Sequence, residues 1–286
     1  MQARANRITR AALATGMLLG VAAAGQLALA APATAVTGLT RQTATGTAGS
    51  AAKTLNKSCP AGSVALGGGG SVSGATGHIG MDFMIPLSGG TGWSITGRED
   101  ASGTGASWSL GTTVLCAPAP AGYAIVSGSS AWSSPSKNWH TVSCPLGQVA
   151  LGVGGAVNGS AVSELLLQDL RIDGSSVTVG ISEHESGFDA NWQVQAKAIC
   201  ADQPAGYERL LDDSSYDSAA TKSVSVTCTA GRKVHGVGAE IVGGEGQVRL
   251  TAAHANSTTQ VTVSASEDDT GTTGNWKVRA FAVCAN

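Results

Sequence analysis

The chain has unusually few charged residues, and this scarcity narrows its fold class. Only 13% of its 286 residues are charged, about half the usual ~25%. Glycine fills 40 positions, about twice its usual ~7% share, and Ser, Thr, Ala and Val are abundant. The shortage of Lys and Glu disfavours helical bundles, and the composition as a whole favours an exported all-β protein.

Long apolar runs are absent after the first thirty residues. Within those thirty, three arginines precede an uncharged apolar run at 11–24, and the motif A-L-A ends at Ala30. This pattern is typical of a secretory signal peptide at 1–30, and no later segment approaches the ~20 apolar residues of a membrane span. We therefore expect a secreted, extracellular protein that does not insert into membranes.

Basic residues are too few to favour binding to nucleic acid. Without the signal peptide the chain keeps 14 basic and 19 acidic residues, a net charge of -5. Polyanion binding depends on clustered Lys and Arg, and a mildly acidic chain is a poor nucleic-acid partner.

The cysteines divide the remaining chain into three copies of one unit. The two cysteines of successive pairs are 57, 56 and 56 residues apart, and the segments CPAGSVALGGGG, CPLGQVALGVGG and CTAGRKVHGVGA align. This is a threefold internal repeat of about 84 residues. A flexible segment at 31–38 is expected before repeats at 39–123, 124–207 and 208–286.

Each repeat is expected to contain five or six antiparallel strands. The segment from Trp192 to Cys200 alternates apolar and polar residues, as a half-buried strand does, and the third repeat has the same alternation. Short connectors with shared sequence indicate repeats docked in fixed orientation. The favoured arrangement is a pseudo-threefold, β-prism-like array, and the alternative is three tandem small β-sandwich modules.

The constant spacing favours one disulfide in each repeat, although six cysteines permit 15 pairings. A rival pairing joins neighbouring repeats. The favoured pairs are Cys59 with Cys116, Cys144 with Cys200, and Cys228 with Cys284.

The glycines that follow the first cysteine of each repeat resemble a phosphate-binding loop. Such a loop needs a helix directly after it, and the following AVNGSAV segment is not helical in pattern. In a strand, Gly152 and Gly154 project to one face and leave it free of side chains. We expect the repeat's tryptophan or a neighbouring repeat to pack there.

An acidic cluster recurs just before a glycine turn in every repeat. Its carboxylates could bind Ca²⁺ or sugar hydroxyls, but the favoured interpretation is that they accept hydrogen bonds from the turn backbone. No metal is therefore expected. The candidate contacts are Glu99, Asp100, Glu183, Glu185, Glu267 and Asp268.

Catalytic and cofactor motifs are absent, since neither G-x-S-x-G, H-E-x-x-H nor C-x-x-C-H occurs, and no histidine recurs at one repeat position. No enzyme activity and no cofactor are expected. Tryptophans found in only one repeat are better candidates, because the shared fold does not require them. Trp93, Trp132 and Trp139 could stack on sugar rings or fill partner pockets, and they could equally fill the core.

The pattern C-P-x-G-x-x-x-L-G-x-G-G followed by W-x-V-x-A-x-x-x-C-A resembles repeats of secreted actinobacterial proteins. The resemblance covers 39–286 and departs at Thr229, in place of the proline, and at His235, in place of the leucine. A similarity limited to cysteine, glycine and threefold repetition is to vitelline membrane outer layer proteins and jacalin-like lectins. It implies antiparallel sheets around a pseudo-threefold axis and carbohydrate binding by apical loops.

The sequence therefore predicts a secreted, non-catalytic binding protein. Its expected partner is an extracellular or cell-surface glycan, recognised in a lectin-like way, or another secreted protein. Two alternatives remain open: a structural or adaptor subunit of a secreted complex, and an inhibitor of a secreted enzyme.

Overall fold

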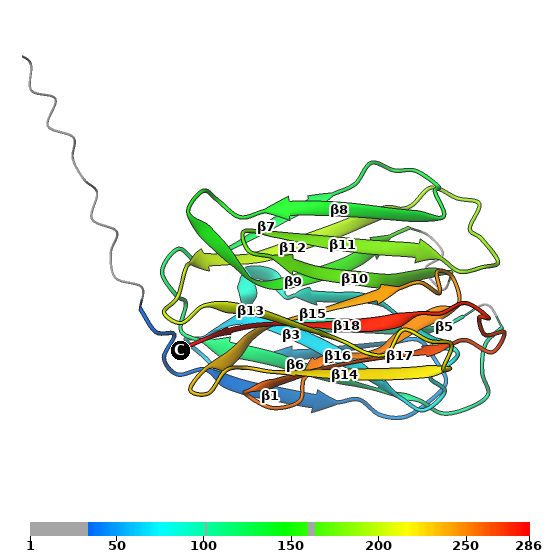
Figure 1. Ribbon diagram of the computed structural model, residues 1–286, viewed down its shortest axis with the longest axis horizontal. Helices are drawn as coiled ribbons and strands as arrows, with labels where there is room; N and C mark the ends of the chain where they lie inside the picture. The colour runs from blue at the N-terminus through cyan, green and yellow to red at the C-terminus, as the bar shows by residue number, and fades with distance from the viewer. Residues whose placement is uncertain (1–33, 101, 160–163) are drawn as a thin grey trace, which may run out of the picture. The chain divides into compact units, whose positions relative to one another are not determined.

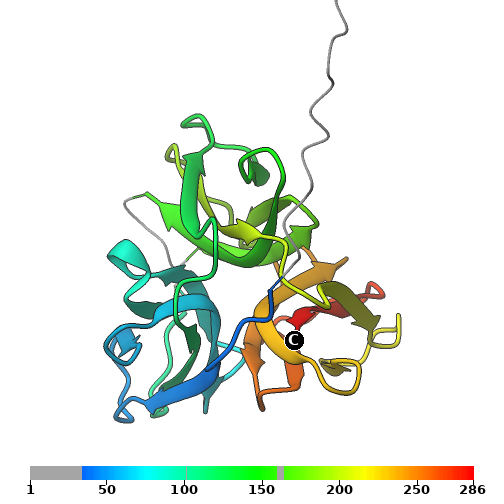
Figure 2. The ribbon, with the colours of Figure 1, turned by 90° about the vertical axis from the view of Figure 1, so that its left-hand side faces the viewer.

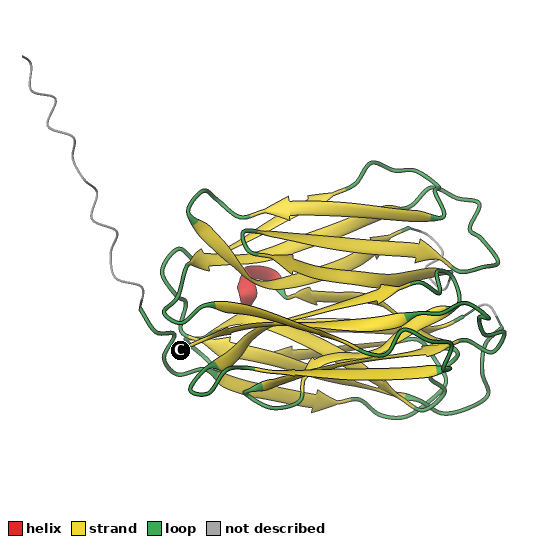
Figure 3. Ribbon diagram, viewed as in Figure 1, coloured by secondary structure: helices red, strands yellow, loops and turns green. Residues whose placement is uncertain are grey.

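The computed structural model describes residues 34–100, 102–159 and 164–286, and they form an all-β protein (Figures 1 and 3). The chain divides into two units, 1–32 and 33–286. The expected signal peptide at 1–30 lies outside the described residues. Among the described residues, no helix is long and apolar enough to cross a membrane.

Each repeat contains six of the described strands, where five or six were expected from the sequence. The first has β1 (Thr40–Thr45), β2 (Lys53–Ser58), β3 (Val64–Ser73), β4 (Ile79–Pro86), β5 (Gly92–Glu99) and β6 (Ser109–Ala117), with the short 3₁₀ turn η1 (Ser88–Gly90). The second has β7 (Ala124–Ser129), β8 (Lys137–Ser143), β9 (Gln148–Asn158), β10 (Leu165–Asp173), β11 (Ser176–Glu183) and β12 (Gln193–Asp202). The third has β13 (Glu208–Asp213), β14 (Thr221–Thr227), β15 (Lys233–Val242), β16 (Val248–Ala255), β17 (Gln260–Glu267) and β18 (Lys277–Ala285).

The strands form three six-stranded antiparallel sheets, and every sheet is shared by two repeats. Sheet I has the order β1-β6-β3-β16-β17-β14, sheet II β2-β5-β4-β9-β12-β7, and sheet III β13-β18-β15-β10-β11-β8. The first, third and sixth strands of a repeat join one sheet, and its second, fourth and fifth strands join another. No repeat could therefore build a complete sheet alone.

Three short strand junctions close the repeats into a ring, seen end-on in Figure 2. The third strand of each repeat pairs with the fourth strand of another, through β3–β16, β9–β4 and β15–β10. This confirms the pseudo-threefold, β-prism-like arrangement. The alternative of three separate sandwich modules does not fit, because the modules would not share sheets.

The recurring glycines bring the third strands together at the centre of this ring. A Cβ built on Gly67 would lie 2.9 Å from Gly236 Cα, one on Gly152 would lie 3.1 Å from Gly67 Cα, and one on Gly236 would lie 3.2 Å from Gly152 Cα. Of the two packing partners expected from the sequence, the neighbouring repeat is the one that fills this side-chain-free face. The glycines thus serve packing, and no helix follows them as a phosphate loop would require.

The three disulfides are the within-repeat pairs expected from the spacing: Cys59–Cys116, Cys144–Cys200 and Cys228–Cys284. Each joins the end of a repeat's second strand to its sixth strand, which lies in a different sheet. Three disulfides and no free cysteine among the described residues fit an oxidising, extracellular-type compartment.

The described part of the 31–38 segment is hydrogen-bonded to the end of the chain and to the connector between β12 and β13. The Val36 N–H donates to Asn286 O at 2.8 Å, and the Ala205 N–H donates to Thr34 O at 3.0 Å. These bonds place the start of the first repeat beside the last strand of the third.

We expect Gly236→Ala to destabilise the protein strongly. The added Cβ would collide with the Leu151 carbonyl oxygen, and backbone cannot move aside as a flexible side chain can. The loss should be about 3 kcal/mol, at the upper end of the usual cost of overpacking, measured by urea unfolding. Gly105→Ala is the control, since no atom lies within 4 Å of its Cβ. Equal stability of the two variants would contradict the packing role.

His235, which departs from the repeat pattern, is a buried histidine beside the central glycines. Leu66 and Leu151 occupy the same position in the other repeats, and all three side chains are buried. The His235 Nδ1 donates to the Lys233 carbonyl oxygen at 2.8 Å. Burial lowers the pKa of His235 below 6.5, although the Lys233 carbonyl opposes the shift, so the folded state favours the neutral ring.

His235→Leu should remove part of the pH dependence of stability. Because the folded-state pKa lies below the unfolded value, the unfolded chain binds the proton first as the pH falls through about 6.5. Wild-type stability then falls with acidification by at most about 1.4 kcal/mol per pH unit from this group.

Urea unfolding between pH 8 and pH 5 tests this expectation. His254, whose pKa burial also lowers, remains in both proteins, so the difference between them isolates His235. Parallel stability curves over this range would contradict the assignment.

Candidate functional site

The repeated glutamates hold the repeated tryptophans. The buried indole N–H groups of Trp108, Trp192 and Trp276 donate to one carboxylate oxygen of Glu99, Glu183 and Glu267 at 2.9, 2.9 and 2.8 Å, respectively. In the first two repeats the second oxygen accepts a turn N–H, from Thr104 at 3.2 Å and from Phe188 at 3.3 Å. In these two repeats the glutamate therefore accepts a hydrogen bond from the turn backbone, which is the role that the sequence favoured.

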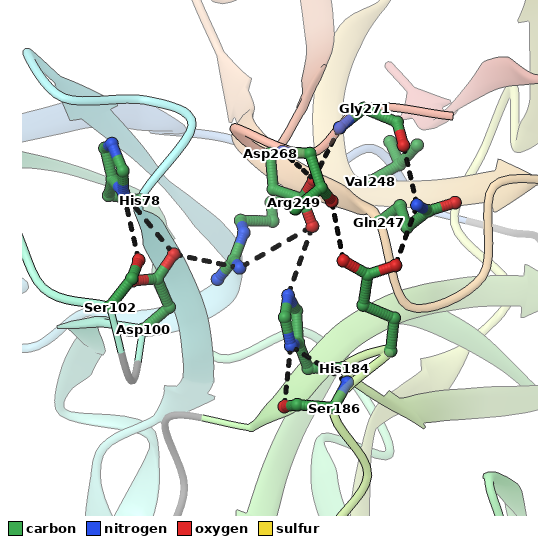
Figure 4. A network of polar contacts seen from close by, with 12 residues as sticks. His78, Asp100, Ser102, His184, Ser186, Gln247, Val248, Arg249, Asp268 and Gly271 are labelled. Atoms are coloured by element: carbon green, nitrogen blue, oxygen red, sulfur yellow. Dashed lines mark hydrogen bonds and ion pairs between the residues drawn. The ribbon is translucent and has the colours of Figure 1, made fainter. Parts of the chain in front are cut away.

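The neighbouring acids Asp100 and Asp268 lie beside a buried arginine (Figure 4). Arg249 Nη2 lies 3.1 Å from Asp100 Oδ2 and 4.0 Å from Asp268 Oδ2, and the arginine side chain is fully buried. Burial lowers the pKa of Arg249, and the carboxylates oppose that shift. The guanidinium therefore balances two buried negative charges contributed by the first and third repeats.

Histidines extend this cluster across all three repeats. His184 Nε2 of the second repeat lies 3.1 Å from Asp268 Oδ2 of the third, and His78 Nδ1 lies 3.6 Å from Asp100 Oδ2 within the first. Glu185 accepts hydrogen bonds from Thr270 Oγ at 2.6 Å and from Gln247 Nε2 at 2.9 Å. Of the acidic positions singled out from the sequence, Asp100, Glu185 and Asp268 thus join the repeats to one another.

Two groups in this cluster have donor types that could hold a metal. In each, the ligand atoms lie within 4.8 Å of one another. The groups are His78, Asp100 and Asp269, and His184, Glu185 and Asp268. Arg249 lies between them and already supplies positive charge, while the Asp268 Oδ1 accepts the Gly271 N–H at 3.0 Å. This arrangement favours a structural cluster.

Arg249→Met should destabilise the protein by roughly 3–5 kcal/mol, the usual consequence of leaving buried charges without their partner. The substitution keeps an apolar chain of similar length but removes the cation between Asp100 and Asp268. Adding Asp100→Asn and Asp268→Asn to Arg249→Met should restore part of the loss, because the amide oxygens keep the turn contacts without the charge.

Urea unfolding at neutral pH measures these differences. Arg209→Met is the matched control, since Arg209 pairs with the half-exposed Asp173 at 3.2 Å and an exposed pair contributes about 1 kcal/mol at most. If Arg249→Met is no less stable than Arg209→Met, the cluster does not hold the repeats together.

The three non-repeating tryptophans lie in different environments. Trp93 is buried and packs against Gly68, where any Cβ would overlap the ring. In the other repeats Val153 and Val237 take the place of this glycine. Trp132 and Trp139 are 56% and 46% exposed. Of the two roles expected for these tryptophans, filling the core therefore fits Trp93. Trp132 and Trp139 are exposed enough to contact a ligand or partner.

Trp139 lies on edge strand β8 of sheet III, directly opposite Gly180 of β11. Its indole N–H reaches across Gly180 and donates to Asp169 Oδ2 at 2.7 Å. A Cβ at position 180 would lie 2.7 Å from Trp139 Cδ1. Glycine at this position therefore allows the indole to lie over β11.

The indole borders a pocket of about 180 Å³, which we call the Trp139 pocket. Its aromatic and charged lining residues are Lys137, Trp139, Asp169, Arg171, Glu240 and Glu245. Lys137 Nζ lies 5.0 Å from the ring centroid and 3.3 Å from Glu245 Oε1. Burial raises the pKa of Asp169, and the nearby Lys137 charge is the largest opposing influence. The pocket thus combines an exposed ring with hydrogen-bond donors and acceptors held in place.

The equivalent positions of the other two sheets lack this chemistry. Trp139 lies five residues before its repeat's first cysteine, where the other repeats have Thr54 and Ser223. Strand register then defines two further sets of three. These sets are the residues equivalent to Trp139, Gly180 and Asp169, in that order. They are Thr54, Thr96 and Phe83 in sheet II, and Ser223, Ser264 and Ala252 in sheet I. The shared fold therefore does not require the Trp139 pocket.

Two larger hollows among the described residues are lined by fewer charged side chains. One, of about 730 Å³, lies beside the β1–β2 connection and has Lys53 as its charged residue. The other, of about 440 Å³, lies near η1 and has Lys197. Neither is lined by a carboxylate, and the Tyr123 hydroxyl in the second already donates to Ala65 O at 2.9 Å. Size alone therefore does not identify the candidate site.

Sequence reasoning identified Trp139 but missed Asp169, Arg171 and Glu240. Gly180 stands where the other repeats have Thr96 and Ser264, and this difference can be seen in the sequence. Its connection with Trp139 can be recognised only when it is known which strands pair. No family model and no curated protein matches the chain.

Proposed function

We propose that this is a secreted, non-catalytic, lectin-like protein that binds extracellular or cell-surface glycan at the Trp139 pocket. The observation that carries the proposal is a half-exposed indole, positioned over Gly180 by Asp169, on the outer face of one of the three sheets. A residue set present on one face only is unnecessary for the fold and available for recognition.

The pocket has the two elements that sugar recognition requires. The apolar face of a pyranose ring packs on an aromatic ring, and indole is the largest aromatic surface a protein offers. Carboxylates such as Glu240 and Glu245 accept hydrogen bonds from sugar hydroxyls, and Arg171 and Lys137 donate them. A pocket of about 180 Å³ is small, which fits contact with one or two sugar rings.

Secretion is part of the proposal and is supported by two features. The N-terminal sequence has the pattern of a signal peptide, and three disulfides are typical of an oxidising compartment. Glycans of cell surfaces and of the surrounding medium are accessible there.

Trp139→Ala should reduce retention on the polysaccharide that the wild type binds by at least about tenfold, because the central aromatic contact is lost. Gly180→Ser, which introduces the residue of the third repeat, should weaken binding in the same direction by displacing the indole. Retention on a panel of immobilised polysaccharides, with elution by free sugar, measures both effects.

Ser223→Ala, at the equivalent position of sheet I, is the matched control and should bind as wild type does. Loss of binding in Trp132→Ala but not in Trp139→Ala would place the site elsewhere. If no polysaccharide retains the wild type, glycan binding is wrong. Co-purification with another secreted protein would then support the adaptor alternative, and inhibition of a secreted hydrolase would support the inhibitor alternative.

A further inference from the structure

One row of side chains crosses the whole outer face of sheet III and begins at Trp139. Residues directly opposite one another in paired strands lie on the same face of a sheet. The register runs from Trp139 through Gly180, Asp169, Glu240 and Arg279 to Asp213. We call this set the polar row, and it contains one residue from each of the six strands.

We infer that the polar row binds a straight, uncharged polysaccharide chain along its length, so that the Trp139 pocket is one subsite of several. This inference rests on the proposed function and names its substrate class. Strands β8 and β13, which hold the first and last residues, are the two edges of the sheet. Five steps of about 4.8 Å between strands make the row roughly 24 Å long, the length of about five sugar rings in an extended chain.

Charge along the row favours a neutral ligand. Four carboxylates and four cations lie in the row and beside it, so neither sign predominates. The carboxylates are those of Asp169, Asp213, Glu240 and Glu245, and the cations are those of Lys137, Arg171, Lys277 and Arg279. A polyanion would meet repulsion from the three carboxylates of the row itself, Asp169, Glu240 and Asp213, whereas hydroxyl groups can both donate to carboxylates and accept from guanidinium groups.

Ion pairs hold the far half of the row in fixed positions. Arg279 Nε lies 2.6 Å from Asp213 Oδ1, and Arg279 Nη1 lies 3.1 Å from Glu240 Oε2. The hydrogen bond from Arg279 lowers the pKa of Asp213 to about 2, so this carboxylate remains an acceptor at neutral pH. The Arg279 and Asp213 side chains are nevertheless 28% and 30% exposed. Polar groups that are preorganised and accessible lose little entropy on binding.

The corresponding rows of the other sheets carry no charge in their far halves. Glu240, Arg279 and Asp213 correspond to Ala156, Gln195 and Ser129 in sheet II, and to Ser71, Gly111 and Thr45 in sheet I. The charged half therefore occurs on the same face as Trp139, although it comes from the third repeat and Trp139 comes from the second. This coincidence favours one continuous site.

A ligand-length series tests the inference. Straight β-linked chains suit an open sheet face, so the probes are cello-oligosaccharides and chito-oligosaccharides of two to six sugars, titrated calorimetrically into the wild-type protein. We expect affinity in at least one series to rise by about tenfold or more between the two-sugar and six-sugar ligands. The double variant Arg279→Gln/Asp213→Asn should lose that rise while keeping the two-sugar affinity.

Gln195→Ala, at the position equivalent to Arg279 in sheet II, is the matched control, and thermal unfolding checks that each variant is folded. Equal affinities for two-sugar and six-sugar ligands would contradict binding along the polar row and leave the Trp139 pocket as a single subsite. Tighter binding of polygalacturonate than of either neutral series would overturn the neutral-chain assignment. If neither series binds but Trp139 is needed for retention on another polysaccharide, the row inference fails and the proposed function stands.

Discussion

Close approach of three strands at the centre of the ring is the contact on which the rest of the structure depends. Gly67, Gly152 and Gly236 each face the backbone of another repeat, so that no side chain separates β3, β9 and β15. This proximity allows each third strand to pair with the fourth strand of another repeat. The shared sheets follow from these pairings, and so does a single core to which all three repeats contribute.

The same arrangement accounts for the acidic clusters. Bringing three repeats onto one axis also brings together three turns that carry carboxylates, and the fourth strands supply Gly80, Leu166 and Arg249 at equivalent positions beside them. Three identical acidic turns would repel one another in a buried setting. Divergence to Arg249 and His184 relieves that repulsion, so the symmetry is broken where strict symmetry would be destabilising.

Much of the fold could be predicted because the three repeats of the chain can be compared with one another. Constant cysteine spacing identified the disulfides, and alternation from Trp192 to Cys200 identified strands. Sheet sharing was not predictable, since local periodicity does not say which repeat supplies a strand's neighbour. For the same reason Glu240 and Arg279 could not be connected with Trp139, which lies 101 and 140 residues earlier, respectively. The repeated glutamates were candidate contacts because they occur in every repeat. In the structure they bind the repeated tryptophans, so their recurrence marks residues that the fold requires.

Because the sheets are shared, two repeats together determine the outer face of each sheet. Sheet III takes β8, β10 and β11 from the second repeat and β13, β15 and β18 from the third. Its polar row therefore forms only when these repeats are joined, with Asp169 and Glu240 meeting at the junction. Substitutions on an outer face leave the glycine contacts and the Trp–Glu pairs unchanged. Each face is thus free to diverge, and sheet III has acquired charges that sheets I and II lack at the same register positions.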